Sequence, residues 1–452
     1  MRTPGGRFVC FDEPPGVWDS WGVTMRRRSI LKAAAGAAVV ASPLAFLFRR
    51  SALAGGGTLV ADPARVLDLP PGFRYAILQR QFEQMSDGYK VPARPDGMAC
   101  FAGPGDTLTL MRNHELDKGW SDTGYASPPP ESFDRKAGGG VTRLVLDQKT
   151  LQPLSSNYVL AGTLRNCAGG ASPWGWLSCE ESVDPGHGYV FRCRTDVTRV
   201  APAERLPGYG RFRHEAAAVD PKTLTVFLSE DQTDGCFYRY RPTDPSKPHT
   251  SGKLQALRVL DVPRFDTSHD LDPGPRLNVD WVDVPNPDPK DDTVRHQARA
   301  AGAARFCRGE GVFFSNGVVY LCCTTGGRAG LGQVFKLTLT PGNGADHLEL
   351  FAESPATNVL DMPDNLCMTP WGDVLLAEDG SGEQFVRGLT PEGRVYDLAR
   401  NAKSTGELAG VCTSPAGDAI FVNMQSDGLT VAITGPFTDL ARQAKHFARR
   451  PA

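Results

Sequence analysis

One two-strand pattern recurs along this chain and constrains its fold more than any other feature. Each copy opens with small and polar residues, passes through two short apolar stretches joined by a Pro/Asp/Gly turn, and ends at a polar or acidic group. Short strands that repeat about every 50 residues or more are typical of propeller blades. We therefore predict an all-β, six-bladed β-propeller with insertions between the blades, with a β-sandwich or jelly roll as the alternative. The six copies span residues 96–115, 166–181, 214–231, 310–324, 364–379 and 407–425.

Length and charge exclude several classes of protein. The chain has 452 residues, of which 40% are hydrophobic, and a single all-β propeller accommodates that length. The 49 Lys and Arg residues nearly balance the 51 Asp and Glu residues. A general binder of nucleic acid or of a membrane surface would carry a basic excess. We therefore expect no nucleic-acid partner, and a monomer that acts on a small molecule.

The N-terminal segment resembles an export signal. Arginines at 26–28 precede Ser-Ile-Leu-Lys and an apolar run over 33–48, and a small-x-small cleavage motif follows at 52–54. Paired arginines before such a run are typical of a twin-arginine signal, and the run is short for a membrane span. We therefore assign residues 1–54 to a signal peptide with an upstream segment, and residues 55–452 to a single β-propeller catalytic domain. An N-terminal membrane anchor is the alternative.

The signal also predicts a partner and a location. Residues 1–24 have no signal character, which makes Met25 a candidate for the true start. The twin-arginine export machinery moves proteins that have already folded, which suits a cofactor loaded in the cytoplasm. We expect the mature protein to be periplasmic or secreted, with no stable membrane anchor after cleavage.

The acidic residues of the repeat lie at equivalent strand ends. In a propeller blade, the residues just before the first strand and just after the second lie on one face, near the central channel. The pattern therefore predicts one acidic ring around one channel mouth. Its predicted members are Glu115, Glu180, Glu181, Glu215, Glu230, Asp231, Glu310, Asp364, Glu378 and Asp379.

Such a ring predicts bound metal ions. Clustered carboxylates repel one another and raise each other's pKa values unless cations neutralise them. Oxygen-rich clusters favour hard cations, and Ca²⁺ is the commonest outside the cytoplasm. Cys179 directly precedes Glu180, and a thiolate beside carboxylates suits a transition metal, with iron and zinc as candidates. The alternative is that these acids cap strands and accept hydrogen bonds in turns.

Several long motifs resemble the PhoX-type alkaline phosphatase family. They occur in one order between about Asn113 and Phe437, and the twin-arginine signal agrees with them. The resemblance implies a six-bladed propeller that uses calcium with an iron pair to hydrolyse phosphomonoesters, and hence a role in phosphate acquisition. The motifs are RNCAGGASPWGWLSCEES, GRFRHEAAAVDPKTLTVFLSEDQTDGCFYRY, FCRGEGVFFSNGVVYLCCTTGG, DNLCMTPWGDVLLAEDG and SPAGDAIFVNMQSDGLTVAITGPF.

The resemblance also implies individual metal ligands. Cys179 would be the thiolate ligand of iron, and Glu215 and Glu310 would be carboxylate ligands at or beside the iron pair. The other members of the predicted metal site are Glu115, Glu180, Glu181, Asp364, Glu378 and Asp379.

The remaining candidate residues concern substrate and protons. The resemblance implies that Arg308, two residues before Glu310, binds the substrate phosphate. A guanidinium suits this role, because it forms bidentate, charge-assisted hydrogen bonds to phosphate. His114 and His214 are candidate catalytic proton carriers, or donors that orient a neighbouring ligand. The sequence contains no G-x-S-x-G motif, which would indicate a serine nucleophile.

Two other functions are compatible with this sequence. One is a calcium-dependent lactonase or phosphodiesterase on the same ring, and the other is a non-catalytic binding propeller braced by metal. A calcium-only lactonase has no need of the Cys179 thiolate, and a purely structural site gains nothing from Arg308. We therefore expect a metal-dependent phosphatase.

Overall fold

The structure is a computed structural model that describes residues 58–260, 262–269, 271–342 and 344–440. The predicted signal peptide and Met25 lie outside these residues. The described chain is all-β, as predicted, and its helices are short: the 3-10 helix η2 (Pro207–Tyr209) and α2 (Val294–Ala300). Within these ranges, the structure contains no helix with the length and apolar character needed to cross a membrane.

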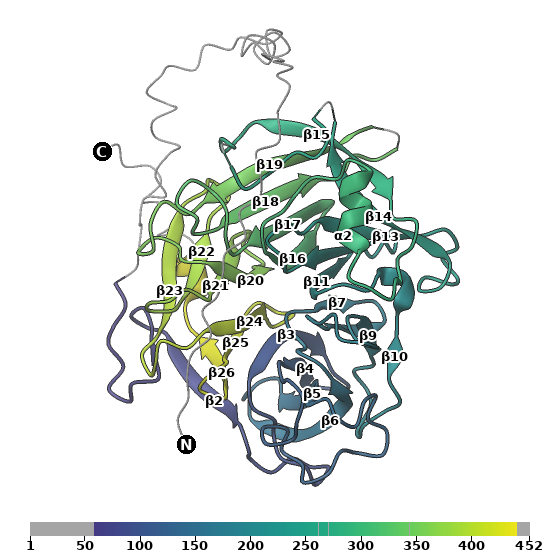
Figure 1. Ribbon diagram of the computed structural model, residues 1–452. Coiled ribbons are helices and arrows are strands. Elements are labelled where there is room, and N and C mark those ends of the chain that lie inside the picture. Colours follow the sequence, from purple (N-terminus) through teal and green to yellow (C-terminus); the bar gives the residue numbers. More distant parts are fainter. Residues whose placement is uncertain (1–57, 261, 270, 343, 441–452) are drawn as a thin grey trace, which may run out of the picture. The chain divides into compact units, whose positions relative to one another are not determined.

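Antiparallel pairing organises the strands into five sheets, two of which follow the chain without interruption (Figure 1). The first contains β3 (Pro95–Ala102), β4 (Thr107–His114), β5 (Gly139–Asp147) and β6 (Pro153–Thr163). The second contains β7 (Gly170–Ser172), β8 (Gly175–Cys179), β9 (Val190–Cys193) and β10 (Glu204–Arg205).

The largest sheet has nine strands and joins two meanders edge to edge. One meander contains β11 (His214–Val219), β12 (Val226–Glu230), β13 (Phe237–Pro242) and β14 (Gly252–Val259). The other contains β16 (Gly309–Ser315), β17 (Val318–Cys323), β18 (Gln333–Thr338) and β19 (Asp346–Glu353). Between them, β15 (Arg276–Asp283) pairs with both β14 and β19.

Two further sheets recruit strands from the start of the described chain. One contains β20 (Pro363–Met368), β21 (Val374–Glu378), β22 (Phe385–Leu389), β23 (Val395–Asn401) and β1 (Leu67–Asp68). The other contains β24 (Leu408–Thr413), β25 (Ile420–Met424), β26 (Leu429–Thr434) and β2 (Arg74–Arg80). Pairing of β2 with β26 ties the two ends of the described chain together.

The six repeated strand pairs predicted from sequence are all present, and their first strands surround one centre. β3 contacts β7, β7 contacts β11, and the series continues through β16, β20 and β24 back to β3. This closed series, visible in Figure 1, makes the arrangement propeller-like. The sheet count differs from the predicted six blades, because β15 merges two meanders into one hydrogen-bonded sheet.

Neighbouring inner strands approach so closely that some positions exclude a side chain. A Cβ atom added at Gly97 would lie 1.7 Å from the carbonyl oxygen of Ala168, and one added at Gly311 would lie 2.8 Å from the backbone nitrogen of Leu366. Gly97 directly follows Asp96, and Gly311 directly follows Glu310. Glycine at these two positions therefore allows acidic residues on different sheets to come together.

Candidate metal centre

Four acidic residues lie where the inner strands depart from regular pairing. Each of these strands has a register shift near its start, and a β-bulge of this kind turns a side chain away from the regular alternation. The bulged residues are thus freed from the alternation that would direct them into the sheet packing. They include Asp96 in β3, Glu215 in β11, Glu310 in β16 and Asp364 in β20.

A second set of residues follows the second strands, and one backbone hydrogen bond defines it. Each member donates its N–H to a backbone carbonyl oxygen at the start of the facing inner segment, over 2.9 to 3.2 Å. The donors therefore occupy one equivalent position in six places around the centre. They are Glu115, Glu181, Asp231, Thr324, Asp379 and Gln425, which bond to Arg94, Arg165, Arg213, Arg308, Met362 and Glu407 respectively.

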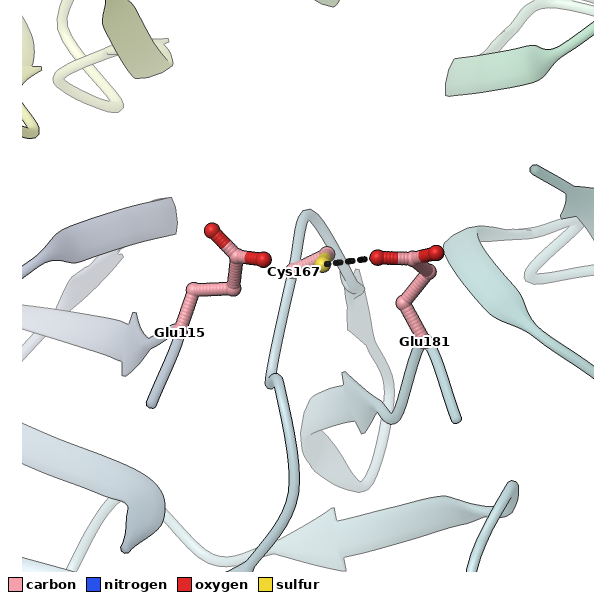
Figure 2. A group of neighbouring side chains, drawn as sticks. All are labelled: Glu115, Cys167 and Glu181. Atoms are coloured by element: carbon pink, nitrogen blue, oxygen red, sulfur yellow. Dashed lines mark hydrogen bonds between the residues drawn. The ribbon is translucent and has the colours of Figure 1, made fainter. Parts of the chain in front are cut away.

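Two groups of side chains could each hold a metal ion, since their ligand atoms lie within 4.8 Å of one another. The cysteine site contains Glu115, Cys167 and Glu181, and Figure 2 shows the thiol between the two carboxylates. The Cys167 Sγ lies 3.9 Å from Glu181 Oε2. The carboxylate site contains Glu215, Glu310 and Asp364.

The two sites belong to a larger cluster, here called the acidic ring. The charges of neighbouring members help to raise the pKa values of Asp96, Glu215, Glu310, Asp379 and Glu407, because these groups are close in space. The acidic ring therefore concentrates negative charge at one place, as the sequence predicts. It comprises Asp96, Glu115, Glu181, Glu215, Asp231, Glu310, Asp364, Asp379 and Glu407.

Burial makes this concentration of charge costly. It raises the pKa values of Glu215 and Glu310 well above the ordinary range, and neighbouring carboxylates add to the effect. Burial also raises the pKa of Glu181 to about 7; Asp231 and Glu115 act in the same direction, whereas Arg165 opposes them. Such shifts mark carboxylates that require cations or protons to offset them.

Arginines supply part of the compensation. Arg308 donates from Nε to Asp231 Oδ1 at 2.9 Å and from Nη2 to Asp231 Oδ2 at 3.0 Å, and Nη2 also lies 3.0 Å from Glu310 Oε1. Arg165 bridges the two carboxylates of the cysteine site, at 3.2 Å from Glu115 and 2.8 Å from Glu181. The acidic ring thus has guanidinium groups directly on its edge.

A comparison with known families identifies the family of this chain. The family model described as alkaline phosphatase PhoX matches residues 54–157 and 148–428. The chain belongs to this family. Members of the PhoX family are metal-dependent phosphatases, so the chain is a hydrolase of phosphate esters.

A solved structure of a PhoX protein supports the fold. Pseudomonas fluorescens PhoX in complex with vanadate, a transition-state analogue, has a TM-score of 0.66 and 18% identity, covering 84% of this chain and 98% of that chain. A gluconolactonase from Xanthomonas campestris has a TM-score of only 0.43 and 12% identity, with 81% and 98% coverage. No curated protein sequence matches the chain.

Most of the sequence-predicted ligands do lie together. Glu115, Glu181, Glu215, Glu310 and Asp364 make up all but the thiol of the two sites. Asp379 belongs to the acidic ring, where burial raises its pKa to about 6, and Arg308 lies on the ring's edge.

The first acid of each sequence pair turns into its sheet instead. Glu180 accepts hydrogen bonds from the backbone N–H groups of Leu164 and Gly188 and lies 2.7 Å from His187 Nδ1. Glu378 accepts from two backbone N–H groups and from Arg387 Nε. These carboxylates already have partners within their sheets, so the structure does not bring Glu180 or Glu378 into either site.

The structure does not bring the predicted thiolate ligand, Cys179, into either site. Cys179 is fully buried in a hydrophobic cluster with Leu177 and Val190, and lies in neither site. Cys167, twelve positions earlier, provides the thiol instead. Cys179 ends β8 facing the packing between sheets, whereas Cys167 precedes β7 in the place that the acids take in other sheets.

The predicted catalytic histidines also lie within the sheets. Both ring nitrogens of His114 are engaged, Nδ1 with the Ala93 carbonyl at 2.9 Å and Nε2 with the Thr142 hydroxyl at 2.8 Å. His214 stacks on Phe212 with ring centroids 3.6 Å apart, and burial lowers its pKa to about 3. We therefore assign neither imidazole a catalytic role.

Sequence reasoning omitted four members of the site from its candidate ligands. Asp96, Cys167 and Glu407 each stand at the start of a recognised repeat copy, and Asp231 stands at the end of one. Their equivalent positions in the repeat were the signal that could have selected them.

Proposed function

We propose that this protein hydrolyses phosphate monoesters at the acidic ring. The observation that carries the proposal is the Arg308 guanidinium, held on the ring by Asp231 and Glu310 and still 32% exposed. A guanidinium in this setting offers bidentate, charge-assisted hydrogen bonds to phosphate oxygens. Membership of the PhoX family supports the same substrate class.

The donor atoms fit two kinds of cation. The cysteine site combines a thiol with carboxylates, a set that suits iron. The carboxylate site offers oxygen atoms alone, which suit Ca²⁺. We propose Fe³⁺ at the cysteine site and Ca²⁺ at the carboxylate site, with Asp379 and the remaining ring acids available to further ions.

The protein's own residues would position the substrate. Arg308 would bind a phosphoryl oxygen and stabilise the charge that develops in the transition state. Asp231 would hold the plane of the guanidinium, because it engages Nε and Nη2 together. When bound, the cations would neutralise other phosphoryl oxygens and lower the pKa of a water molecule.

The finer points of architecture and location are part of the same proposal. We infer that the nine-stranded sheet corresponds to two blades joined through β15, which gives six blades in all. We also infer export by the twin-arginine route and activity in the periplasm or outside the cell, as a monomer that serves phosphate acquisition. The arginine pair ahead of the apolar run supports export.

Turnover of p-nitrophenyl phosphate by the purified protein tests the proposed activity. We expect turnover that a chelator abolishes and that calcium with iron restores, together with both elements in the metal analysis. Bis(p-nitrophenyl) phosphate and a sugar lactone serve as control substrates. Chelator-insensitive or absent turnover of the monoester would refute the proposal, and faster hydrolysis of either control would favour the corresponding alternative.

A further inference from the structure

Thr324 and Gln425 are the neutral members of the set of residues that follow the second strands, and Thr324 is the member with a hydroxyl. Its backbone N–H donates to the Arg308 carbonyl oxygen at 3.0 Å, as Asp231 donates to Arg213 and Glu181 to Arg165. Four of the six residues in this position carry a carboxylate, Gln425 carries an amide that donates to Asp96 and Glu115, and Thr324 carries a hydroxyl. The fold thus places a hydroxyl where four of its equivalents supply acids to the ring.

Strand alternation sets the direction of the Thr324 side chain. Cys323, the last residue of β17, packs in a hydrophobic cluster with Phe306 and Phe335. Successive side chains along a strand point to opposite faces. The same alternation separates Glu230, bonded to Tyr238 inside its sheet, from Asp231 on the ring. Thr324 therefore faces the ring.

The Thr324 hydroxyl is an unusual group for such a place. It is fully buried, and among the described residues it has no hydrogen-bond partner. An unsatisfied buried hydroxyl is destabilising, and such groups in native proteins often have a functional reason. No hydrogen bond of the hydroxyl within the described residues accounts for threonine at this position.

We propose that the Thr324 hydroxyl donates a hydrogen bond to the phosphoryl group of the substrate, beside Arg308. The inference rests on the proposed phosphatase function. A carboxylate at this position would repel a phosphate dianion, whereas a hydroxyl can donate a hydrogen bond to an anionic oxygen. Arg308 and Thr324 are linked through the Arg308 carbonyl, so both donors belong to one segment of the ring.

The test compares Thr324→Val, which keeps the shape but removes the hydroxyl, with Thr324→Ser, which keeps it. The probes are kcat and KM on p-nitrophenyl phosphate, the Kd of inorganic phosphate by calorimetry, and metal content. We expect Thr324→Val to bind phosphate and to turn over substrate about 10- to 100-fold less well, with unchanged metal content. Thr324→Ser should lie within about 3-fold of the wild type.

Each other outcome counts against the inference. Wild-type behaviour of Thr324→Val would mean that the hydroxyl does not contact substrate, and loss of metal would make Thr324 a metal ligand instead. If Thr324→Val fails to fold, a Thr324→Ser variant with strongly weakened phosphate binding would also contradict the proposal.

Failure of the proposed function is separable from failure of this inference. Phosphate affinity needs no turnover, so the Val and Ser variants remain informative even if the wild type does not hydrolyse p-nitrophenyl phosphate. An active wild type with an equally active Thr324→Val would reject the role of Thr324 alone.

Discussion

The Arg308 guanidinium and the Asp231 carboxylate form two parallel hydrogen bonds, of 2.9 and 3.0 Å, between the ends of adjacent inner strand pairs. Arg308 adopts a backbone φ of 53°, a left-handed conformation that is uncommon for a residue with a side chain. Strain of this kind persists where the surroundings fix it and often accompanies function. The geometry therefore holds a cation on the edge of the acidic ring in one orientation.

Arg308→Lys should keep the positive charge but lose the bidentate hydrogen bonding of the guanidinium. Because an ammonium cannot reproduce the bidentate geometry, we expect kcat/KM on p-nitrophenyl phosphate to fall about 100-fold. Arg276→Lys is a matched control, since Arg276 forms an exposed ion pair with Glu349 on the outer strands. Equal activity of the two variants would exclude Arg308 from substrate binding.

The two cysteines should respond differently to Ser substitution. Cys167→Ser should remove the thiol from the cysteine site, lower the iron content and abolish any thiolate-to-iron absorption band. Cys179→Ser should retain both and instead lose about 1–3 kcal/mol of stability, because it places a hydroxyl in a hydrophobic cluster. Loss of the band in Cys179→Ser alone would show that Cys179, and not Cys167, is the thiolate ligand. Visible absorption, iron analysis and thermal unfolding measure these effects.

The adjacent acids Glu180 and Glu181 should separate stability from metal binding. Glu180→Gln turns an amide donor or a neutral oxygen toward three backbone N–H groups, and we expect a loss of about 2–4 kcal/mol in urea unfolding. Glu181→Gln should leave stability in chelator nearly unchanged or higher, and should reduce metal content. The reverse pattern would mean that Glu180 is the ligand.

The metal-free protein should lose stability as pH rises. Burial raises the pKa values of Glu181, Glu230 and Glu378 from 4.5 to about 7. The folded state then binds more protons than the unfolded chain between about pH 4.5 and 7, so the free energy of unfolding falls across this window. In chelator, we expect at least about 2 kcal/mol less stability at pH 8 than at pH 5.

Cations should reverse this trend, which supplies the control. Metal ions compete with protons for the oxygens of ring acids such as Glu181, so the gain in melting temperature on adding calcium and iron should grow from pH 5 to pH 8. A metal-free protein that is most stable at pH 8 would show that the ring acids are already neutralised by the protein's own arginines.

The sequence predicted the repeat well because strand pairs are local. Each copy, such as residues 214–231, contains both strands and the turn that joins them. Sheet edges depend on distant pairing, and no local pattern indicates that β2 pairs with β26 or that β15 pairs with β19. The pairing of the outer strands of the blades therefore could not be predicted from the sequence.

The site was predictable in place but not in detail. Acidic residues at strand ends indicated the ring. Glu180 and Glu181 are both glutamates, however, and only strand alternation decides which of them faces the ring. The same ambiguity led to Cys179 rather than Cys167, because a register shift before β7 is not encoded by residue type. His114 similarly precedes a ring acid in the sequence, but its side chain is directed into its own sheet, where it contacts the Thr142 hydroxyl.

Anomalous X-ray scattering from crystals of the purified protein tests the proposed metal centre most directly. An iron peak is expected within about 2.0–2.6 Å of Cys167 Sγ and the carboxylates of Glu115 and Glu181, and a calcium peak within about 2.3–2.6 Å of Glu215, Glu310 and Asp364. The absence of anomalous density from the acidic ring of active protein, or a peak at Cys179 instead, would contradict it.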